Sequence, residues 1–182
     1  MKIALLGAGR IGRIHARAIS DHPLAQLACV SDAFPEAANS LAAEYGVPVM
    51  TAEDIFASAE IDGVLIASST PTHCDFLERA ARAGKAVLCE KPIDLDLART
   101  RHCLGVLAEH PVTCALGFNR RHDPQFSALK QALEAGRIGE LEMITITSRD
   151  PEPPPAEYVA ASGGLFRDMS IHDLDMAAWL LG

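Results

Sequence analysis

The chain has 182 residues, 49% of them hydrophobic and 22% charged, which suits a soluble protein with one large domain or with one domain and part of another. Its formal net charge of -8 argues against nucleic acid or an anionic membrane surface as the main partner, because both attract basic patches. No apolar run approaches the length of a membrane span, and five cysteines without a C-x-x-C pair predict reduced thiols and a cytoplasmic location.

The segment 2–12, KIALLGAGRIG, combines a short apolar strand, a G-x-G-x-x-G turn and the start of a helix. In a dinucleotide-binding fold Gly7 makes the tight turn, Gly9 admits a pyrophosphate, and Gly12 lets helix and strand pack closely. The helix start adds free N–H groups and a positive dipole end. The predicted phosphate-binding residues are Gly7, Gly9, Arg10, Ile11 and Gly12. A plain strand-to-helix turn is the alternative.

A second strand, 26–31, is expected to end at Asp32, which follows Gly12 by 20 residues. At this distance a dinucleotide-binding fold places the carboxylate that accepts hydrogen bonds from the adenosine ribose. No lysine or arginine occurs in 33–35, so a 2′-phosphate would meet an uncompensated negative charge, which favours NAD over NADP. Asp32 is also compatible with a helix-capping role before Pro35, and we weigh this as a second role.

Strands and helices continue to alternate as far as residue 117, which predicts an α/β fold with a Rossmann-type, doubly wound parallel sheet. Further strands are expected at 47–50, 64–67, 86–89 and 112–117, and further helices at 35–45, from Thr51, up to Ala83, and from Asp94 or Asp96 to Glu109. Cys29, Cys89 and Cys114 lie in apolar runs, where buried thiols are expected.

Polar residues follow two of these strands, at the sheet edge where open α/β folds bind ligands. The segment 68–73 follows one strand, and Glu90 and Lys91 follow the next, with their side chains expected on opposite faces. The predicted cofactor contacts at this edge are Ser68, Thr70, His73, Glu90 and Lys91. Thr72 is as compatible with capping the following helix as with touching the cofactor. A solvated lysine is the alternative for Lys91.

Beyond residue 117 the pattern changes. A polar linker, 118–124, precedes a helix expected at 124–135, and 141–148, LEMITITS, alternates as a strand of a second sheet does. The segment 150–155 is expected to be extended because it is rich in proline, and 162–164 to form a turn.

Asp168 and His172 are expected at positions i and i+4 of a final helix that runs to Leu181, and therefore on one face of it. A carboxylate beside an imidazole orients the ring and raises its basicity, as a general base requires. A solvated pair is the alternative. A metal site that adds His122 and Asp123 is weaker, since no tight ligand spacing supports it.

Four motifs in this order resemble the Gfo/Idh/MocA oxidoreductase family. They are the glycine turn at 7–12, Glu90-Lys91-Pro92, Gly117-Phe118-Asn119-Arg120-Arg121, and Ser162-Gly163-Gly164 with Asp168-x-x-x-His172. The resemblance covers essentially the whole chain, and the segment 148–179 is similar to the inositol dehydrogenases of that family.

The resemblance implies hydride transfer from a ring carbon of myo-inositol, or of a related cyclic polyol or sugar, to NAD. It implies that Lys91, often beside a cis proline, contacts substrate and cofactor, and that His172 is the general base, supported by Asp168. The residues expected to contact substrate are Lys91, Asn119, Arg120, Asp168 and His172. Alternatives are an NADP-dependent keto-sugar reductase of the same family and a non-catalytic dinucleotide-binding module.

The expected domains are an NAD-binding domain, 1–117, and the first part of an α+β domain for substrate binding and oligomerisation, 118–182. Family members continue into further strands, so we expect the chain to be incomplete and its own activity to be uncertain. The resemblance also implies a homo-oligomer, a dimer or tetramer, when the protein is full length.

Overall fold

The computed structural model describes residues 1–149, 152–156, 159 and 162–182. Residue contacts separate the chain into two units, Met1–Gly117 and Phe118–Gly182.

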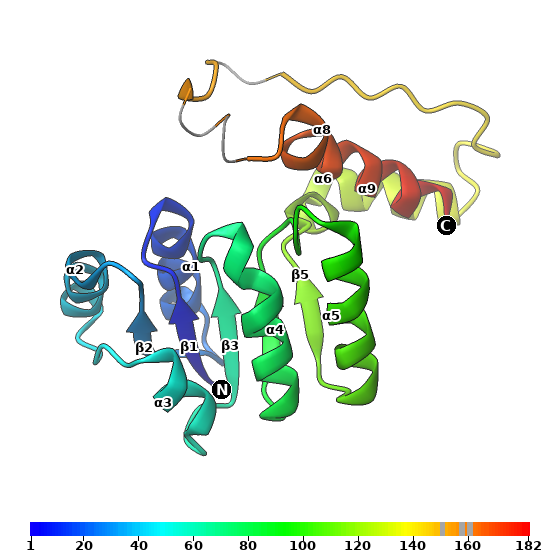
Figure 1. Ribbon diagram of the computed structural model, residues 1–182. Coiled ribbons are helices and arrows are strands. Elements are labelled where there is room, and N and C mark those ends of the chain that lie inside the picture. Colours follow the sequence, from blue (N-terminus) through cyan, green and yellow to red (C-terminus); the bar gives the residue numbers. More distant parts are fainter. Residues whose placement is uncertain (150–151, 157–158, 160–161) are drawn as a thin grey trace. The chain divides into compact units, whose positions relative to one another are not determined.

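The first unit is built on a five-stranded sheet with the strand order β2-β1-β3-β4-β5, in which every pairing is parallel (Figure 1). The strands are β1 (Lys2–Leu6), β2 (Gln26–Ser31), β3 (Gly63–Ile66), β4 (Ala86–Cys89) and β5 (Cys114–Leu116). The order reverses between β1 and β3, which is the point at which doubly wound sheets bind ligands. The predicted α/β, doubly wound fold is confirmed.

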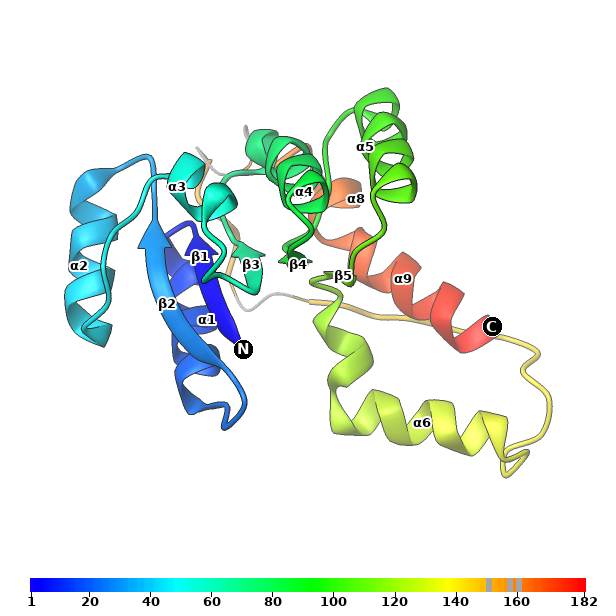
Figure 2. The same cartoon turned by 90° about the horizontal axis from the view of Figure 1, so that it is seen from below.

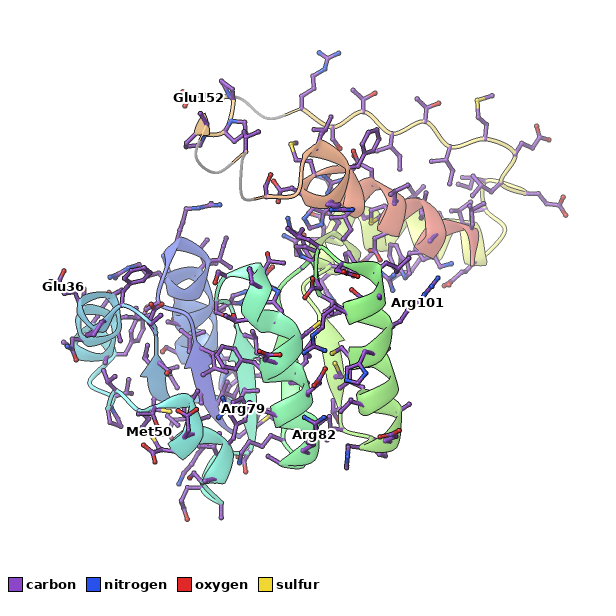
Figure 3. All side chains as sticks on the ribbon, in the orientation of Figure 1. Glu36, Met50, Arg79, Arg82, Arg101 and Glu152 are labelled. Atoms are coloured by element: carbon purple, nitrogen blue, oxygen red, sulfur yellow. The ribbon has the colours of Figure 1, made fainter. Side chains whose placement is uncertain are left out.

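Helices cover both faces of this sheet, and each face has its own apolar core (Figure 2). The helices are α1 (Arg10–Asp21), α2 (Pro35–Tyr45), α3 (Ala52–Ala57), α4 (His73–Arg82) and α5 (Leu97–Glu109). Leu5 and Leu41 belong to the core under α1 and α2, whereas Ile66 and Leu77 belong to the core under α3, α4 and α5. On the outside, the Arg79 guanidinium of α4 lies 4.5 Å from the ring centre of Phe56 in α3 (Figure 3).

The helix boundaries follow from side chains that bind free backbone groups. Thr51 accepts a hydrogen bond from the Asp54 N–H at the start of α3, and Asp96 accepts two at the start of α5. Gly46 ends α2 in the left-handed conformation, with a φ of 65°. These predicted helix ends are confirmed, and Asp96 rather than Asp94 is the cap of α5.

Two sequence predictions in the first unit are wrong, and one of the two alternatives for Thr72 is excluded. The strand expected at 47–50 is reduced to a single bridge between Val30 and Val49, because the chain touches the sheet edge only there. Thr72 makes no side-chain cap on α4, since its hydroxyl donates to the Ser69 carbonyl instead. Cys114 is exposed, whereas Cys29 and Cys89 are buried as predicted.

The second unit is helical where it is regular. It contains a 3₁₀ turn η2 (Asn119–His122), α6 (Pro124–Glu134), α8 (Leu165–Asp168) and α9 (Ser170–Leu181). Asp123 caps α6 by accepting hydrogen bonds from the N–H groups of Gln125 and Phe126. The predicted helix and the predicted turn at 162–164 are both present, whereas part of the expected proline-rich segment, residues 150–151, lies outside the described residues.

Two predictions for this unit are wrong. The segment 141–148 has no strand pairing, and Met143 is 81% exposed. A strand needs a neighbour to satisfy its backbone groups, and none of the described residues of the second unit forms one. The helix expected from Asp168 to Leu181 begins only at Ser170 as α9, and Asp168 ends the separate short helix α8, so Asp168 and His172 do not share one continuous helix.

Candidate functional site

The three glycines after β1 have different surroundings. A methyl group on Gly7, whose φ is +109°, would lie 2.4 Å from the Ala67 carbonyl oxygen, and one on Gly12 would lie 2.0 Å from the Gly7 carbonyl oxygen. A methyl group on Gly9 would meet nothing within 4 Å. Gly7 and Gly12 are therefore required by packing, while Gly9 leaves open space beside the turn.

Gly9, which has open space beside it, is also the residue directly before α1. Gly9 is the N-cap and has an extended backbone, with φ −71° and ψ −168°. It has no side chain with which to bind the first N–H groups of the helix, and Arg10 and Ile11 provide the first of these groups. A 12-residue helix with an open N-terminus next to bare backbone fits a phosphate group well.

Asp32 follows β2 and holds the glycine turn in place. Its Oδ2 accepts a hydrogen bond from the Ala8 N–H at 2.6 Å, and its Oδ1 accepts one from the Phe34 N–H at 2.8 Å. The suggested capping role is wrong, because Phe34 is the N-cap of α2. Each carboxylate oxygen can accept a second hydrogen bond, so Asp32 can still bind ribose hydroxyls.

The turn after β3 carries hydroxyl groups that bind one another. Thr72 donates its hydroxyl to the Ser69 carbonyl at 2.7 Å, so Ser68 is the donor in the 2.6 Å contact between the Ser68 and Thr72 hydroxyls. Thr70 begins the short 3₁₀ turn η1 (Thr70–Thr72) beside them. Gly7 lies directly against this turn, since a Cβ added to it would be only 2.4 Å from the Ala67 carbonyl oxygen.

His73 is also predicted to contact cofactor, but its side chain lies in the interior. The residue is 2% exposed. Its Nδ1 lies 2.7 Å from the Pro92 carbonyl oxygen and its Nε2 3.0 Å from the Ser68 carbonyl oxygen. Both ring nitrogens therefore bind the backbone of turns at this edge of the sheet.

The turn after β4 contains Glu90 and Lys91. Glu90 forms a 2.7 Å pair with His15 of α1, and the Lys91–Pro92 peptide bond is cis. Burial raises the pKa of the Glu90 carboxyl, but the hydrogen bond and charge of His15, together with the backbone and charge of Lys91, outweigh it and leave that pKa below its ordinary value. Lys91 is partly buried.

In the second unit two arginines of η2 bind aspartates of α9. Arg120 pairs with Asp173, whose Oδ1 also accepts a hydrogen bond from the Ser148 hydroxyl at 2.6 Å. Arg121 binds both carboxylate oxygens of Asp175, with Nε 2.9 Å from Oδ2, and the Asp175 side chain is 7% exposed. Helical spacing in the sequence cannot reveal these pairs, because the two partners lie on different elements.

These pairs set the surroundings of His172. The Phe118 ring meets the His172 ring edge-on, with centres 6.3 Å apart and planes at 90°. Burial raises the pKa of the Asp173 carboxyl. Hydrogen bonds from Ser148 and Arg120, together with the charges of Arg120 and His172, outweigh burial and leave that pKa below its ordinary value. Residues 119–122 are thus fixed against α9, which carries His172.

The structure groups the predicted site residues within each unit. In the first unit the glycine turn, Asp32, Ser68, Thr70, Glu90 and Lys91 lie at the carboxyl edge of the sheet. In the second unit Asn119 and Arg120 lie in the turn that is bound to α9. Among the described residues no group of three or more His, Cys, Asp or Glu residues is arranged to hold a metal ion.

A parallel sheet with its order reversal beside a glycine turn, an open helix N-terminus and a carboxylate after β2 defines a dinucleotide-binding domain of the Rossmann type. Sequence comparison agrees: residues 1–118 match the oxidoreductase family with an NAD-binding Rossmann fold, and residues 126–182 match the GFO/IDH/MocA C-terminal domain. The chain belongs to the GFO/IDH/MocA oxidoreductase family, and its first unit is the NAD-binding domain of that family.

Similar proteins include several dehydrogenases of inositols. The chain is 56% identical over 182 residues to an inositol 2-dehydrogenase of Rhizobium meliloti (strain 1021), covering 100% of this chain and 55% of that protein. The crystal structure of a myo-inositol dehydrogenase from Corynebacterium glutamicum superposes with a TM-score of 0.93 at 46% identity, covering 99% of this chain and 54% of the other.

A third similar structure contains ligands. It is a scyllo-inositol dehydrogenase from Lactobacillus casei with bound NAD(H) and scyllo-inositol, with a TM-score of 0.82 and 33% identity over 99% of this chain and 56% of the other. The chain spans about half the length of the curated relatives that it matches. Within the described part of the chain, no helix combines the length and apolar character that a membrane crossing requires.

Proposed function

We propose that the protein oxidises a ring hydroxyl of a cyclic polyol to a ketone and transfers the hydride to NAD, with myo-inositol as the substrate. The observation that carries this proposal is the 56% identity to an inositol 2-dehydrogenase across all 182 residues. The neighbour that contains both NAD(H) and scyllo-inositol supports the same class of substrate. The cofactor edge is the proposed cofactor-binding part of the first unit, formed by the glycine turn, Asp32, Ser68, Thr70, Glu90 and Lys91. The polyol-binding segment is the proposed substrate-binding part of the second unit, formed by Asn119 and Arg120.

The cofactor edge supplies contacts along the length of a dinucleotide. The open start of α1 at Gly9 is the place for the pyrophosphate, and the remaining lone pairs of Asp32 are the acceptors for ribose hydroxyls. Ser68, Thr70 and Glu90 would contact the cofactor further along the edge. NAD, when bound, supplies the carbon that accepts the hydride.

Three side chains would serve the reaction itself. His172 takes the hydroxyl proton as the C–H hydride leaves, and the electron pair of the O–H bond becomes the second bond of the ketone. Asp168 supports the imidazole, and the Lys91 ammonium stabilises the alkoxide-like oxygen of the transition state. The products are the ketone, the reduced cofactor and a protonated His172.

The polyol-binding segment would recognise the other hydroxyls of the ring. Asn119 offers both a donor and an acceptor, and Arg120 offers donors whose orientation is fixed by its pair with Asp173. Because the Arg120–Asp173 pair holds the guanidinium in one place, the polyol would meet a preorganised group.

We also propose that the complete protein is a cytoplasmic homo-oligomer, a dimer or tetramer, whose second unit serves substrate binding and assembly. Five free cysteines support a reducing compartment. The family resemblance supports the assembly, and size-exclusion chromatography with light scattering of the complete protein tests it.

The test of the reaction supplies the complete protein with NAD and with myo-inositol, scyllo-inositol or one of a panel of sugars, and measures the NAD that is reduced. Lys91→Ala and His172→Ala should each lower kcat by about 100-fold or more, since they remove charge stabilisation and the base. Lys2→Ala and His22→Ala, which alter exposed residues away from the cofactor edge, are the matched controls. Unchanged turnover in both Lys91→Ala and His172→Ala would overturn the assigned roles.

A further inference from the structure

His73 contacts two atoms that can only accept hydrogen bonds. Its Nδ1 lies 2.7 Å from the Pro92 carbonyl oxygen and its Nε2 lies 3.0 Å from the Ser68 carbonyl oxygen. A neutral imidazole has a single N–H, so it satisfies one such contact and directs a lone pair at the other oxygen. Whichever ring nitrogen carries the proton, the ring lies within hydrogen-bond distance of both carbonyl oxygens.

The two carbonyl groups belong to different turns at the cofactor edge. Ser68 lies in the turn after β3, and Pro92 directly follows Lys91 in the turn after β4. Gly7 packs against the first of these turns, within 2.4 Å of the Ala67 carbonyl oxygen when a Cβ is added. The glycine turn, the Ser68 turn and the Lys91 turn are therefore linked in series, and His73 is the link between the last two.

We propose that His73 is a positioning residue, whose two ring nitrogens hold the turn that carries Lys91 to the turn that faces the cofactor. It does not itself touch cofactor or substrate, because its side chain is buried and both nitrogens are occupied. The effect on Lys91 rests on the proposed function, whereas the two contacts of the His73 ring do not.

The same unit contains a second link of this kind, which provides a matched control. Lys85 is 5% exposed, and its Nζ donates to the Ser58 carbonyl at 2.6 Å and to the Ile61 carbonyl at 2.9 Å. Ile61 precedes β3 and Lys85 precedes β4, so this link joins the same two strands at their opposite, amino-terminal ends.

The first experiment compares His73→Leu with Lys85→Met in the 182-residue chain. Both substitutions put an apolar side chain of similar size at a buried position and leave two carbonyls without their polar partner, one buried and one partly buried, so both should lower the thermal stability of the first unit. Only His73→Leu should also weaken NAD binding, by about 10-fold or more, because it releases turns at the cofactor edge. Equal loss of NAD affinity in both variants, or no loss in His73→Leu, would overturn the proposal.

The second experiment uses the unaltered chain and remains decisive if His73→Leu fails to fold. Nitrogen-15 NMR of the histidine rings should show a His73 ring N–H that is hydrogen-bonded to a backbone carbonyl and exchanges slowly with solvent. A His73 ring N–H that exchanges as fast as that of the exposed His22 would overturn the proposal, since the ring would then not be held between the two turns. Neither this measurement nor the NAD titration requires turnover, so a failed polyol assay would count against the proposed function and not against the role of His73.

Discussion

At Asp32 one carboxylate is in a position to serve both the fold and the cofactor. Its two oxygens hold the N–H groups of Ala8 and Phe34, at 2.6 Å and 2.8 Å, which fixes the glycine turn to the end of β2. The remaining lone pairs are the proposed ribose acceptors. Because Ala33, Phe34 and Pro35 carry no positive charge, a 2′-phosphate at this point would face the carboxylate without compensation.

Asp32→Ala should weaken NAD binding by about 10- to 100-fold, since hydrogen bonds to a charged group are lost together with the support of Ala8. NADP binding should fall less or rise, because the repulsion is removed at the same time. Calorimetric titration of both cofactors checks this. An equal fall for NAD and NADP would show that Asp32 acts only through the fold, and a preference of the unaltered chain for NADP would favour the keto-sugar reductase.

The buried cysteines are expected to be unreactive. Burial raises the pKa of Cys29 to about 11, and burial together with Cys103 raises that of Cys74 to about 12, so these thiols stay protonated at neutral pH. Cys89 and Cys103 are also buried and have raised pKa values, mainly through burial.

A disulfide reagent added to the folded chain at neutral pH should therefore modify Cys114 alone, which is exposed. Reaction at Cys114 should still be slow, because partial burial raises its pKa. Full unfolding should expose all five thiols, and Cys114→Ser should abolish the reaction of the folded chain. Rapid reaction of a second thiol without unfolding would contradict the burial found for the other four.

At the scale of elements, the turn from β1 to α1 contains one glycine that packing requires, Gly12, and one that the proposed cofactor binding requires, Gly9. Gly12 faces the Gly7 carbonyl oxygen so closely that any side chain must displace backbone, whereas Gly9 faces open space. The two positions lie in one motif but have different physical reasons for being glycine.

Gly12→Ala should lower the free energy of unfolding by about 1–3 kcal/mol or more, because its methyl group would force β1 and α1 apart. Gly9→Ala should change it by less than about 1 kcal/mol. It should nevertheless weaken NAD binding, since the methyl group would occupy the space for the pyrophosphate. Urea unfolding and NAD titration of both variants give the comparison, and a stability loss in Gly9→Ala as large as that in Gly12→Ala would contradict it.

The His15–Glu90 pair connects α1 to the turn after β4. The pKa of Glu90 is lowered in the folded chain, so its contribution to stability is present above the unfolded-state pKa and is lost as the pH falls through the folded-state pKa. Glu90→Gln should therefore cost about 1–3 kcal/mol near pH 6 and progressively less as the pH approaches about 3.

Urea unfolding across this pH range measures the Glu90 effect. Glu36→Gln, at an exposed position in the first turn of α2, is the control for loss of one carboxylate (Figure 3). A difference between the unaltered chain and Glu90→Gln that stays constant with pH would contradict the pairing.

Elements that are specified by residues within the same segment could be predicted from the sequence. Elements that form only by pairing with a segment elsewhere in the chain could not. The apolar runs, Thr51 and Gly46 identified the strands and helix ends of the first unit because their signals are local. The alternating pattern of 141–148 is also local, but pairing requires a second strand, so the prediction was wrong.

The same distinction holds for the candidate site. The glycine turn and Asp32 follow from spacing, since both lie close together in one strand–helix–strand unit. The link made by His73 and the pairs of Arg120 and Arg121 with α9 could not be predicted, because each joins residues far apart in sequence. The separation of Asp168 from α9 could not be predicted, because 168–170 contain no glycine or proline to mark a helix end.

At the scale of the whole molecule, the proposed reaction divides its tasks between the two units. The NAD-binding domain carries Lys91, and the second unit carries Asn119, Arg120, Asp168 and His172. Cofactor binding is thus expected of the first unit alone, whereas turnover requires both. NAD binding without turnover of any polyol or sugar would favour the non-catalytic dinucleotide-binding module.

Hydride transfer from the polyol to NAD is the central claim, and isotope transfer tests it most directly. The protein is incubated with NAD and myo-inositol that carries deuterium on the carbon to be oxidised, and the reduced cofactor is analysed by mass spectrometry. The proposed reaction predicts reduced cofactor that contains the deuterium, together with the corresponding ketone. Absence of reduced cofactor, or reduced cofactor without deuterium, would contradict it.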